Sequence, residues 1–181
     1  PLLAALNSSP PYAPYLNQLN LEDQNNTLDS DNAKRTACLQ LTEQCLRAHP
    51  EQMIQRFGPY KALADVANSL KQNPNMMSYL DDQYLTDIVV WYHVAWLGET
   101  VRRTDARVQA LIDKGRAFND QDKRQLLEII GELLTSIVPR YSKLADRGQV
   151  ELSVTPYAHP IMPLLLDICS AHEAMPDVNL E

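Results

Sequence analysis

Gly148-Gln-Val-Glu-Leu-Ser-Val-Thr-Pro-Tyr-Ala-His-Pro-Ile-Met-Pro163 is the segment most informative about the architecture of this chain. Its apolar residues at 150–154 alternate with polar ones, which is the period-2 pattern of a β-strand with one buried face. The prolines that follow each fix a φ angle, so we expect a stiff loop carrying Tyr157 and His159. The segment therefore predicts a strand over about 148–154 that ends in a rigid loop presenting a histidine. In α/β enzymes, binding groups lie on such loops.

Elsewhere in the 181 residues the patterns are helical, and we find no second convincing strand. The sequence thus predicts a predominantly α-helical chain with one strand at about 148–154. A single strand cannot pair its own backbone N–H and C=O groups. We therefore expect the chain to be an internal segment of a larger protein that supplies the neighbouring strands.

The chain is expected to contain a loop-rich lead-in over 1–31, a helical part over 32–147, and the strand, histidine loop and last helix over 148–181. Apolar residues spaced three or four positions apart, with capping residues and prolines at the ends, predict the helices. Their expected ranges are 33–48, a helix starting at Pro50, 59–73, 82–103, 105–114, 120–147 and 163–174. The helix over 82–103 is apolar nearly all round at its centre, so it should be buried on several sides.

Composition and charge exclude several classes of partner. The net charge is −7 and the pI about 5.0. Because an acidic protein binds the negatively charged phosphates of nucleic acid poorly, no nucleic-acid partner is expected. The longest apolar run, Ile88–Leu97, has about half the length that spans a bilayer, so no membrane association is expected. No zinc-binding spacing and no glycine-rich phosphate loop occurs, and we expect neither a metal nor a cofactor.

The three cysteines indicate the compartment. Cys38 and Cys45 lie seven residues apart on one predicted helix, too far for a disulfide. Cys169 lies among leucine and isoleucine. We expect all three to be buried free thiols, which fits a reducing, cytoplasmic location.

Two candidates for binding a substrate lie at the strand and its loop. On that loop, His159 could hydrogen-bond a substrate hydroxyl through either ring nitrogen; ordinary loop packing is the alternative. Glu151 points away from the apolar face of the strand. It would line the interior of a closed barrel, but on a one-sided sheet it would only face solvent.

Aromatic residues surround His93 in the apolar helix. Trp91, Tyr92 and Trp96 could form a wall on which a sugar ring stacks. The alternative is that both tryptophans pack in the core and that His93 is a core histidine hydrogen-bonded to a carbonyl or carboxylate.

Five segments carry a resemblance to a known family. In chain order they are Leu85-Thr-Asp-Ile-Val-Val-Trp-Tyr-His-Val-Ala-Trp-Leu-Gly98, Lys114-Gly-Arg-Ala-Phe-Asn-Asp120, Ile137-Val-Pro-Arg-Tyr141, the stretch 147–167 that includes the histidine loop, and Ala174-Met-Pro176. Together they resemble glycoside hydrolase family 57, closely over 80–176 and poorly over the first 80 residues. The motif at 148–160 is fairly specific and resembles the second of the family's characteristic sequence regions.

The resemblance implies a retaining enzyme that acts on α-glucans, of the amylase, branching-enzyme or 4-α-glucanotransferase type, with a catalytic domain that is an incomplete (β/α) barrel of seven strands. Retaining chemistry needs two carboxylates. In the family these are a Glu nucleophile and an Asp acid/base on later strands, and neither motif occurs in this chain, nor does the family's N-terminal His-Gln-Pro motif. Glu151 and His159 match positions of the second region, which lines the site without forming the covalent bond.

The expected substrate contacts are therefore His159, Glu151, Trp96 and Tyr157, with no catalytic residue in the segment. The expected partners are an α-glucan or maltooligosaccharide and the rest of the barrel domain. One alternative is a self-contained, non-catalytic helical binding or regulatory module, which would have to pair residues 150–154 in a dimer or bury them as coil. A third, weaker interpretation is a lyase or hydrolase with His159 as base, for which no convergent partner is visible.

Overall fold

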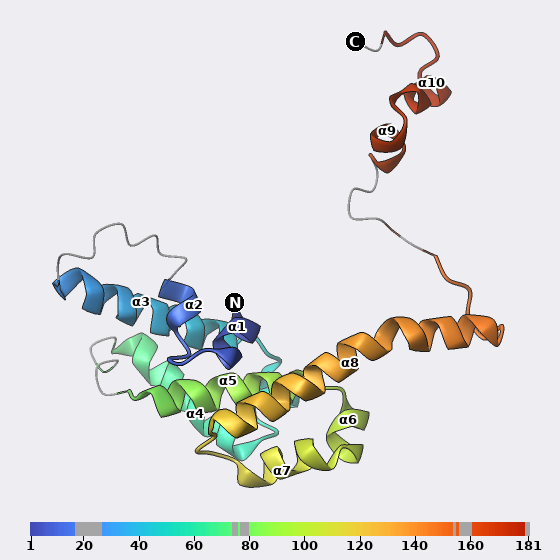
Figure 1. Cartoon of the computed structure of the whole chain (residues 1–181). Helices are drawn as coiled ribbons and strands as arrows, with labels where there is room; N and C mark the ends of the chain where they lie inside the picture. The colour runs from blue at the N-terminus through green and yellow to red at the C-terminus, as the bar shows by residue number, and fades with distance from the viewer. Residues whose placement is uncertain (17–26, 74–75, 77–79, 154, 156–160, 180–181) are drawn as a thin grey trace. The chain divides into compact units, whose positions relative to one another are not determined.

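The computed structural model describes residues 1–16, 27–73, 76, 80–153, 155 and 161–179, with the backbone alone at 27–30. The described chain is mostly helical (Figure 1). Its elements are α1 (Leu2–Asn7), α2 (Ala13–Leu16), α3 (Thr27–Cys45), the π-helical turn η2 (Pro50–Ile54), α4 (Gly58–Gln72), α5 (Asp82–Trp96), α6 (Glu99–Thr104), α7 (Ala106–Lys114), α8 (Asp120–Asp146), α9 (Met162–Leu166), the 3₁₀ turn η4 (Ile168–Ser170) and α10 (Ala171–Ala174). The chain forms two compact units, Pro1–Leu134 and Thr135–Glu181.

Helix α5 lies in the middle of the first unit, as its apolar sequence predicts. It packs against α1, α3, η2 and α4 (Figure 1). Residues Leu85 to Trp91 are all buried. The indole of Trp91 lies at the centre of an aromatic cluster, with ring centroids 5.3 Å from Phe57, 6.4 Å from Tyr60 and 6.4 Å from Phe118. Burial of these large rings contributes much of the stability of the unit.

Several helix ends form as the capping residues predict. The Asp81 carboxylate accepts the backbone N–H of Tyr84 (2.9 Å) at the start of α5. The Asn119 side chain accepts the N–H of Gln121 (2.9 Å) at the start of α8. Gly115 follows α7 with φ +73°, the left-handed conformation that glycine adopts at least cost.

The expected continuous helix over 82–103 is wrong, because α5 ends at Trp96 and α6 begins at Glu99. The backbone is extended at Leu97 (ψ 144°) and Gly98 (ψ 146°), and the guanidinium of Arg102 donates hydrogen bonds to the carbonyls of Ala95 (2.8 Å) and Leu97. Carbonyls at a helix end need partners, and this side chain supplies them where the helix breaks.

Three other boundaries differ from expectation. Helix α3 begins at Thr27, before the expected start at 33, and ends at Cys45. Pro50 does begin a helical turn, but the turn is π-helical and stops at Ile54. The expected last helix over 163–174 is replaced by α9, η4 and α10. Asp167 separates the first two of these, because its side chain accepts the N–H of Cys169 (2.9 Å) and caps a new turn.

The predicted strand at 148–154 does not form over 148–153, and Val154 lies outside the described residues. Gly148 ends the preceding helix with φ +64°, as predicted. Residues 150–153 then continue without regular structure. The physical reason is the absence of a partner. A strand forms its ladder of hydrogen bonds with a second strand, and the described part of the chain contains none.

The cysteine prediction is confirmed for two of the three thiols. Cys38 and Cys45 are free and buried, and burial raises the pKa of Cys38 to about 11. Cys169 is also free but is exposed, so the expectation of burial is wrong there. Its neighbours in the second unit are exposed as well, because this unit buries few of its apolar side chains.

Exposed apolar side chains are concentrated in the second unit. Val138 on α8 is 76% exposed and Leu166 at the end of α9 is 81% exposed. The others are Ile137, Tyr141, Val150, Leu152, Ile161, Leu164, Leu165, Ile168 and Met175. Most of the large apolar side chains that are exposed among the described residues therefore lie in this unit.

Candidate functional site

The structure describes two of the four predicted substrate contacts. Trp96 is the last residue of α5, in the first unit, and its side chain is 56% exposed. Glu151 is exposed in the irregular segment after α8, in the second unit. Tyr157 and His159 lie outside the described residues. Their roles, and that of Glu151, stay predictions.

An aromatic group occupies the C-terminal end of α5 and consists of Tyr92, His93 and Trp96. The Tyr92 and Trp96 ring centroids are 6.0 Å apart and their planes are inclined by 49°. The His93 ring meets the Tyr92 ring edge-on, with centroids 5.3 Å apart and planes at 86°. Tyr92 and His93 are partly buried, so Trp96 presents the largest free aromatic surface of the group.

His93 makes the contact expected of a core histidine, a hydrogen bond to a backbone carbonyl. Its Nδ1 lies 2.8 Å from the carbonyl oxygen of Val89, one turn earlier on α5, and therefore donates to it. Burial lowers the pKa of His93, with this hydrogen bond opposing the shift. The imidazole is thus neutral near pH 7, as expected of a core histidine that donates to a carbonyl.

The two tryptophans of α5 have opposite environments. Trp91 is 1% exposed, and its Nε1 donates to the carbonyl of Gly115 (2.7 Å). Core packing is therefore confirmed for Trp91 and wrong for Trp96. The difference follows from position: Trp91 faces the bundle, whereas Trp96 lies at the helix end just before the break at Leu97.

A network of arginines around Glu99 lies directly after this break. The Glu99 carboxylate accepts from Arg56 (2.9 Å), Arg102 (2.8 Å) and Arg103 (2.7 Å). Hydrogen bonds from Arg56 and Arg102 lower the pKa of Glu99 to about 2. Arg102 also binds the carbonyls of Ala95 and Leu97. The backbone on both sides of Trp96 is therefore held by one side chain, whose orientation the network sets.

Asp87 is a residue that the sequence analysis did not single out, and its carboxylate is central to the packing of α5. It is 7% exposed and accepts the backbone N–H groups of Ala117 (2.9 Å) and Phe118 (2.9 Å) and the side-chain amide of Gln83 (2.8 Å). It thereby fixes the connection between α7 and α8 to the middle of α5. The signal in the sequence was its position, a lone acidic residue inside a run of buried apolar ones, which requires partners.

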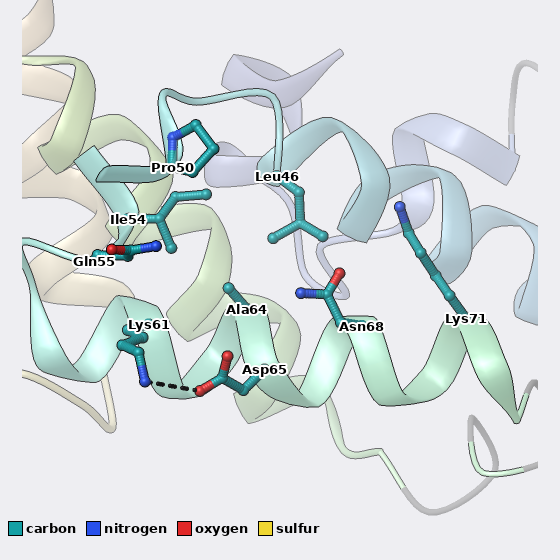
Figure 2. A pocket seen from close by; sticks show the side chains of 9 residues that line it. All are labelled: Leu46, Pro50, Ile54, Gln55, Lys61, Ala64, Asp65, Asn68 and Lys71. Carbon is teal, nitrogen blue, oxygen red and sulfur yellow. Dashed lines mark hydrogen bonds and ion pairs between the residues drawn. The ribbon is translucent and has the colours of Figure 1, made fainter. Parts of the chain in front are cut away.

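A hollow of about 350 Å³ lies between η2 and α4 (Figure 2). Leu46 and Ile54 face Ala64 and Asn68 across it. Lys61 and Asp65 form an ion pair on its rim, 3.4 Å apart. Polar and apolar side chains both line the hollow, and none of the lining residues is aromatic. The exposed ring of Trp96 therefore suits the face of a sugar better than this hollow does.

Metal-binding clusters and membrane-spanning helices are both absent from the residues that the structure describes. In that part of the chain, no three side chains of His, Cys, Asp or Glu gather as ligands of a metal ion would. None of the described helices combines the length and the apolar character needed to cross a membrane.

Comparison with known proteins identifies the family to which this chain belongs. The family model described as glycosyl hydrolase family 57 matches residues 11–179, most of the chain. The chain therefore belongs to glycosyl hydrolase family 57, and the resemblance carried by the sequence motifs is confirmed. It is a member of a group of glycoside hydrolases and transferases that act on α-glucans. No curated protein and no solved structure matches the chain.

Proposed function

We propose that this chain is part of the catalytic domain of a retaining α-glucan-active enzyme of the amylase, branching-enzyme or 4-α-glucanotransferase type, acting in the cytoplasm. In this proposal the chain supplies substrate contacts at His159, Glu151, Tyr157 and Trp96. The nucleophile and the acid/base belong to strands of a seven-stranded incomplete (β/α) barrel outside it. The observation that carries the proposal is the family match over residues 11–179.

The exposed apolar surface of the second unit supports a larger domain. Val138 and Leu166 leave most of their side-chain surface in water, which costs free energy that burial against another surface would recover. The strand-like sequence at 150–154 has the same requirement, since its backbone needs a neighbouring strand. Both features fit a unit that completes its packing against the remainder of a barrel.

The proposal predicts that the purified 181-residue chain does not turn over glucans. Retaining hydrolysis needs two carboxylates about 5–5.5 Å apart across the scissile bond, and the motifs that carry them in this family are not in the sequence. Reducing-end and iodine-staining assays with maltoheptaose and amylopectin should stay at the level of the buffer.

A longer enzyme of the same family that contains both carboxylates provides the positive control for these assays. Turnover by the purified chain that rises with its concentration and survives a second purification step would refute the assignment of catalysis to strands outside it.

A further inference from the structure

A second hollow, of about 460 Å³, is lined by α4, by the middle of α5 and by the connection that follows α7. Its wall on α4 is apolar and includes Leu63 and Val66, and Val66 is 41% exposed. Two charged residues also line it, Asp87 of α5 and Arg116 of the connection. The hollow therefore combines an apolar wall with one negative and one positive side chain.

The Asp87 carboxylate is buried without a cation beside it. Its three hydrogen bonds come from uncharged donors, the N–H groups of Ala117 and Phe118 and the side-chain amide of Gln83. Among the described residues it forms no ion pair, although buried charges in proteins are ordinarily paired. Two of the three bonds end on Oδ1 and one on Oδ2, so Oδ2 retains a lone pair for a further donor.

The guanidinium of Arg116 has no acceptor within the described part of the chain. Its side chain is exposed, and its one hydrogen bond runs from the backbone N–H to the Lys114 carbonyl (2.9 Å). Arg116 and Asp87 thus line one hollow without pairing with each other. A ligand that carries both an ammonium group and a carboxylate is complementary to this arrangement.

The wall formed by the connection is held in place without a ligand. Gly115 and Ala117 both have left-handed backbones, with φ +73° and +57°. The indole of Trp91 donates to the Gly115 carbonyl, and the Asp87 carboxylate accepts the Ala117 N–H. A Cβ on Gly115 would lie 3.4 Å from Cγ of Pro59, so the connection also closely approaches the start of α4. A ligand therefore does not have to order this wall when it binds.

We propose that this hollow binds a small zwitterion with an apolar body, the chemistry of an apolar α-amino acid such as leucine. The ammonium group donates to Asp87, and the carboxylate accepts from Arg116. The side chain lies against Leu63 and Val66. The inference does not rest on the proposed function, because none of these four residues is a predicted substrate contact.

The two tryptophans of α5 provide the readout. In ¹H–¹⁵N spectra of the full 181-residue chain titrated with leucine, the Trp91 indole signal should shift, because its acceptor Gly115 lines the hollow. We expect a Kd on the order of 1 mM. The Trp96 indole, at the far end of α5, should not shift.

Three analogues of leucine test the parts of the site separately. Leucinamide lacks the carboxylate charge and 4-methylpentanoate lacks the ammonium group, so each should bind at least about tenfold more weakly than leucine. Serine keeps both charges but lacks the apolar side chain, and it should also bind at least about tenfold more weakly.

Variants assign the contacts to residues. Arg116→Gln should weaken leucine binding about tenfold and leave leucinamide binding unchanged, because the group that Arg116 binds is missing from leucinamide. Val66→Ser should weaken leucine about two- to fivefold through lost apolar contact. Arg124→Gln removes an exposed arginine on α8 and should leave binding unchanged. All three variants alter exposed side chains and keep the hydrogen bonds of Asp87, so they should melt with the parent chain.

Four results would each overturn the proposal. The first is a Trp91 signal that stays in place when leucine is added. Equal binding of leucinamide would show that the hollow receives the amino end of a peptide instead. Equal binding of 4-methylpentanoate would show an apolar hollow with no use for an ammonium group. Unchanged leucine binding by the folded Arg116→Gln chain would remove the carboxylate contact on which the choice of a zwitterion depends.

Discussion

Replacement of Asp87 by alanine is expected to lower the melting temperature of the chain by about 5–15 °C. The carboxylate accepts three hydrogen bonds, from Ala117, Phe118 and Gln83, and is 7% exposed. Its removal leaves buried N–H donors without an acceptor, which costs about 2–4 kcal/mol in all. For a chain of this size each kcal/mol corresponds to about 2–4 °C.

Two further variants make this experiment specific. Asp87→Asn retains one oxygen but places an NH₂ group against a loop N–H, so it should lose about half as much stability as the alanine variant. Asp113→Ala removes an exposed carboxylate on α7 and should change the melting temperature by no more than about 2 °C. If the three variants melted together, Asp87 would not be the anchor of the α7–α8 connection.

The second large effect concerns catalysis in the complete enzyme. His159→Ala is expected to reduce kcat/KM about 5- to 150-fold, corresponding to about 1–3 kcal/mol for one hydrogen bond to a sugar hydroxyl. Part of the loss should fall on kcat, because such a bond strengthens as the oxocarbenium-like transition state forms. The melting temperature should change little, because the sequence predicts a loop that Pro156, Pro160 and Pro163 stiffen without help from the imidazole ring.

A packing role for His159 predicts the reverse pattern. The variant would then melt earlier, and the fraction that stays folded would retain normal kinetics. Measuring kcat/KM and the melting temperature on the same preparation separates the two roles. A His159→Ala enzyme with unchanged kcat/KM would remove this histidine from the site.

Local sequence signals predicted the helices well. The cap at Asp81, the glycine stop at Gly115 and the cap at Asn119 act within one turn of the chain, so their residue types suffice to locate α5, α7 and the start of α8. The break after Trp96 was missed, and the guanidinium of Arg102, which binds a carbonyl at this helix end, belongs to the next helix. The spacing of apolar residues predicts which face of a helix is buried, but it does not predict a hydrogen bond from a side chain on another helix.

The candidate site was predicted less completely, for the same physical reason. Trp96 was recognised as an aromatic residue near His93, but its exposure and that of Trp91 depend on where α5 ends. Asp87 binds backbone groups about thirty residues away, and a sequence pattern does not show such a pairing. The predicted strand does not form over 148–153, because a strand is stable only with a partner strand and its own residues do not suffice.

The contacts of α5 with Gly115, Ala117 and Phe118 set a limit on how this protein can evolve. Surface connections ordinarily accept inserted or deleted residues. Here Trp91 binds one end of the connection, and Asp87, one turn earlier, binds the other. An added residue would shift the three backbone groups out of register with both side chains, so variation in length should accumulate elsewhere in the chain.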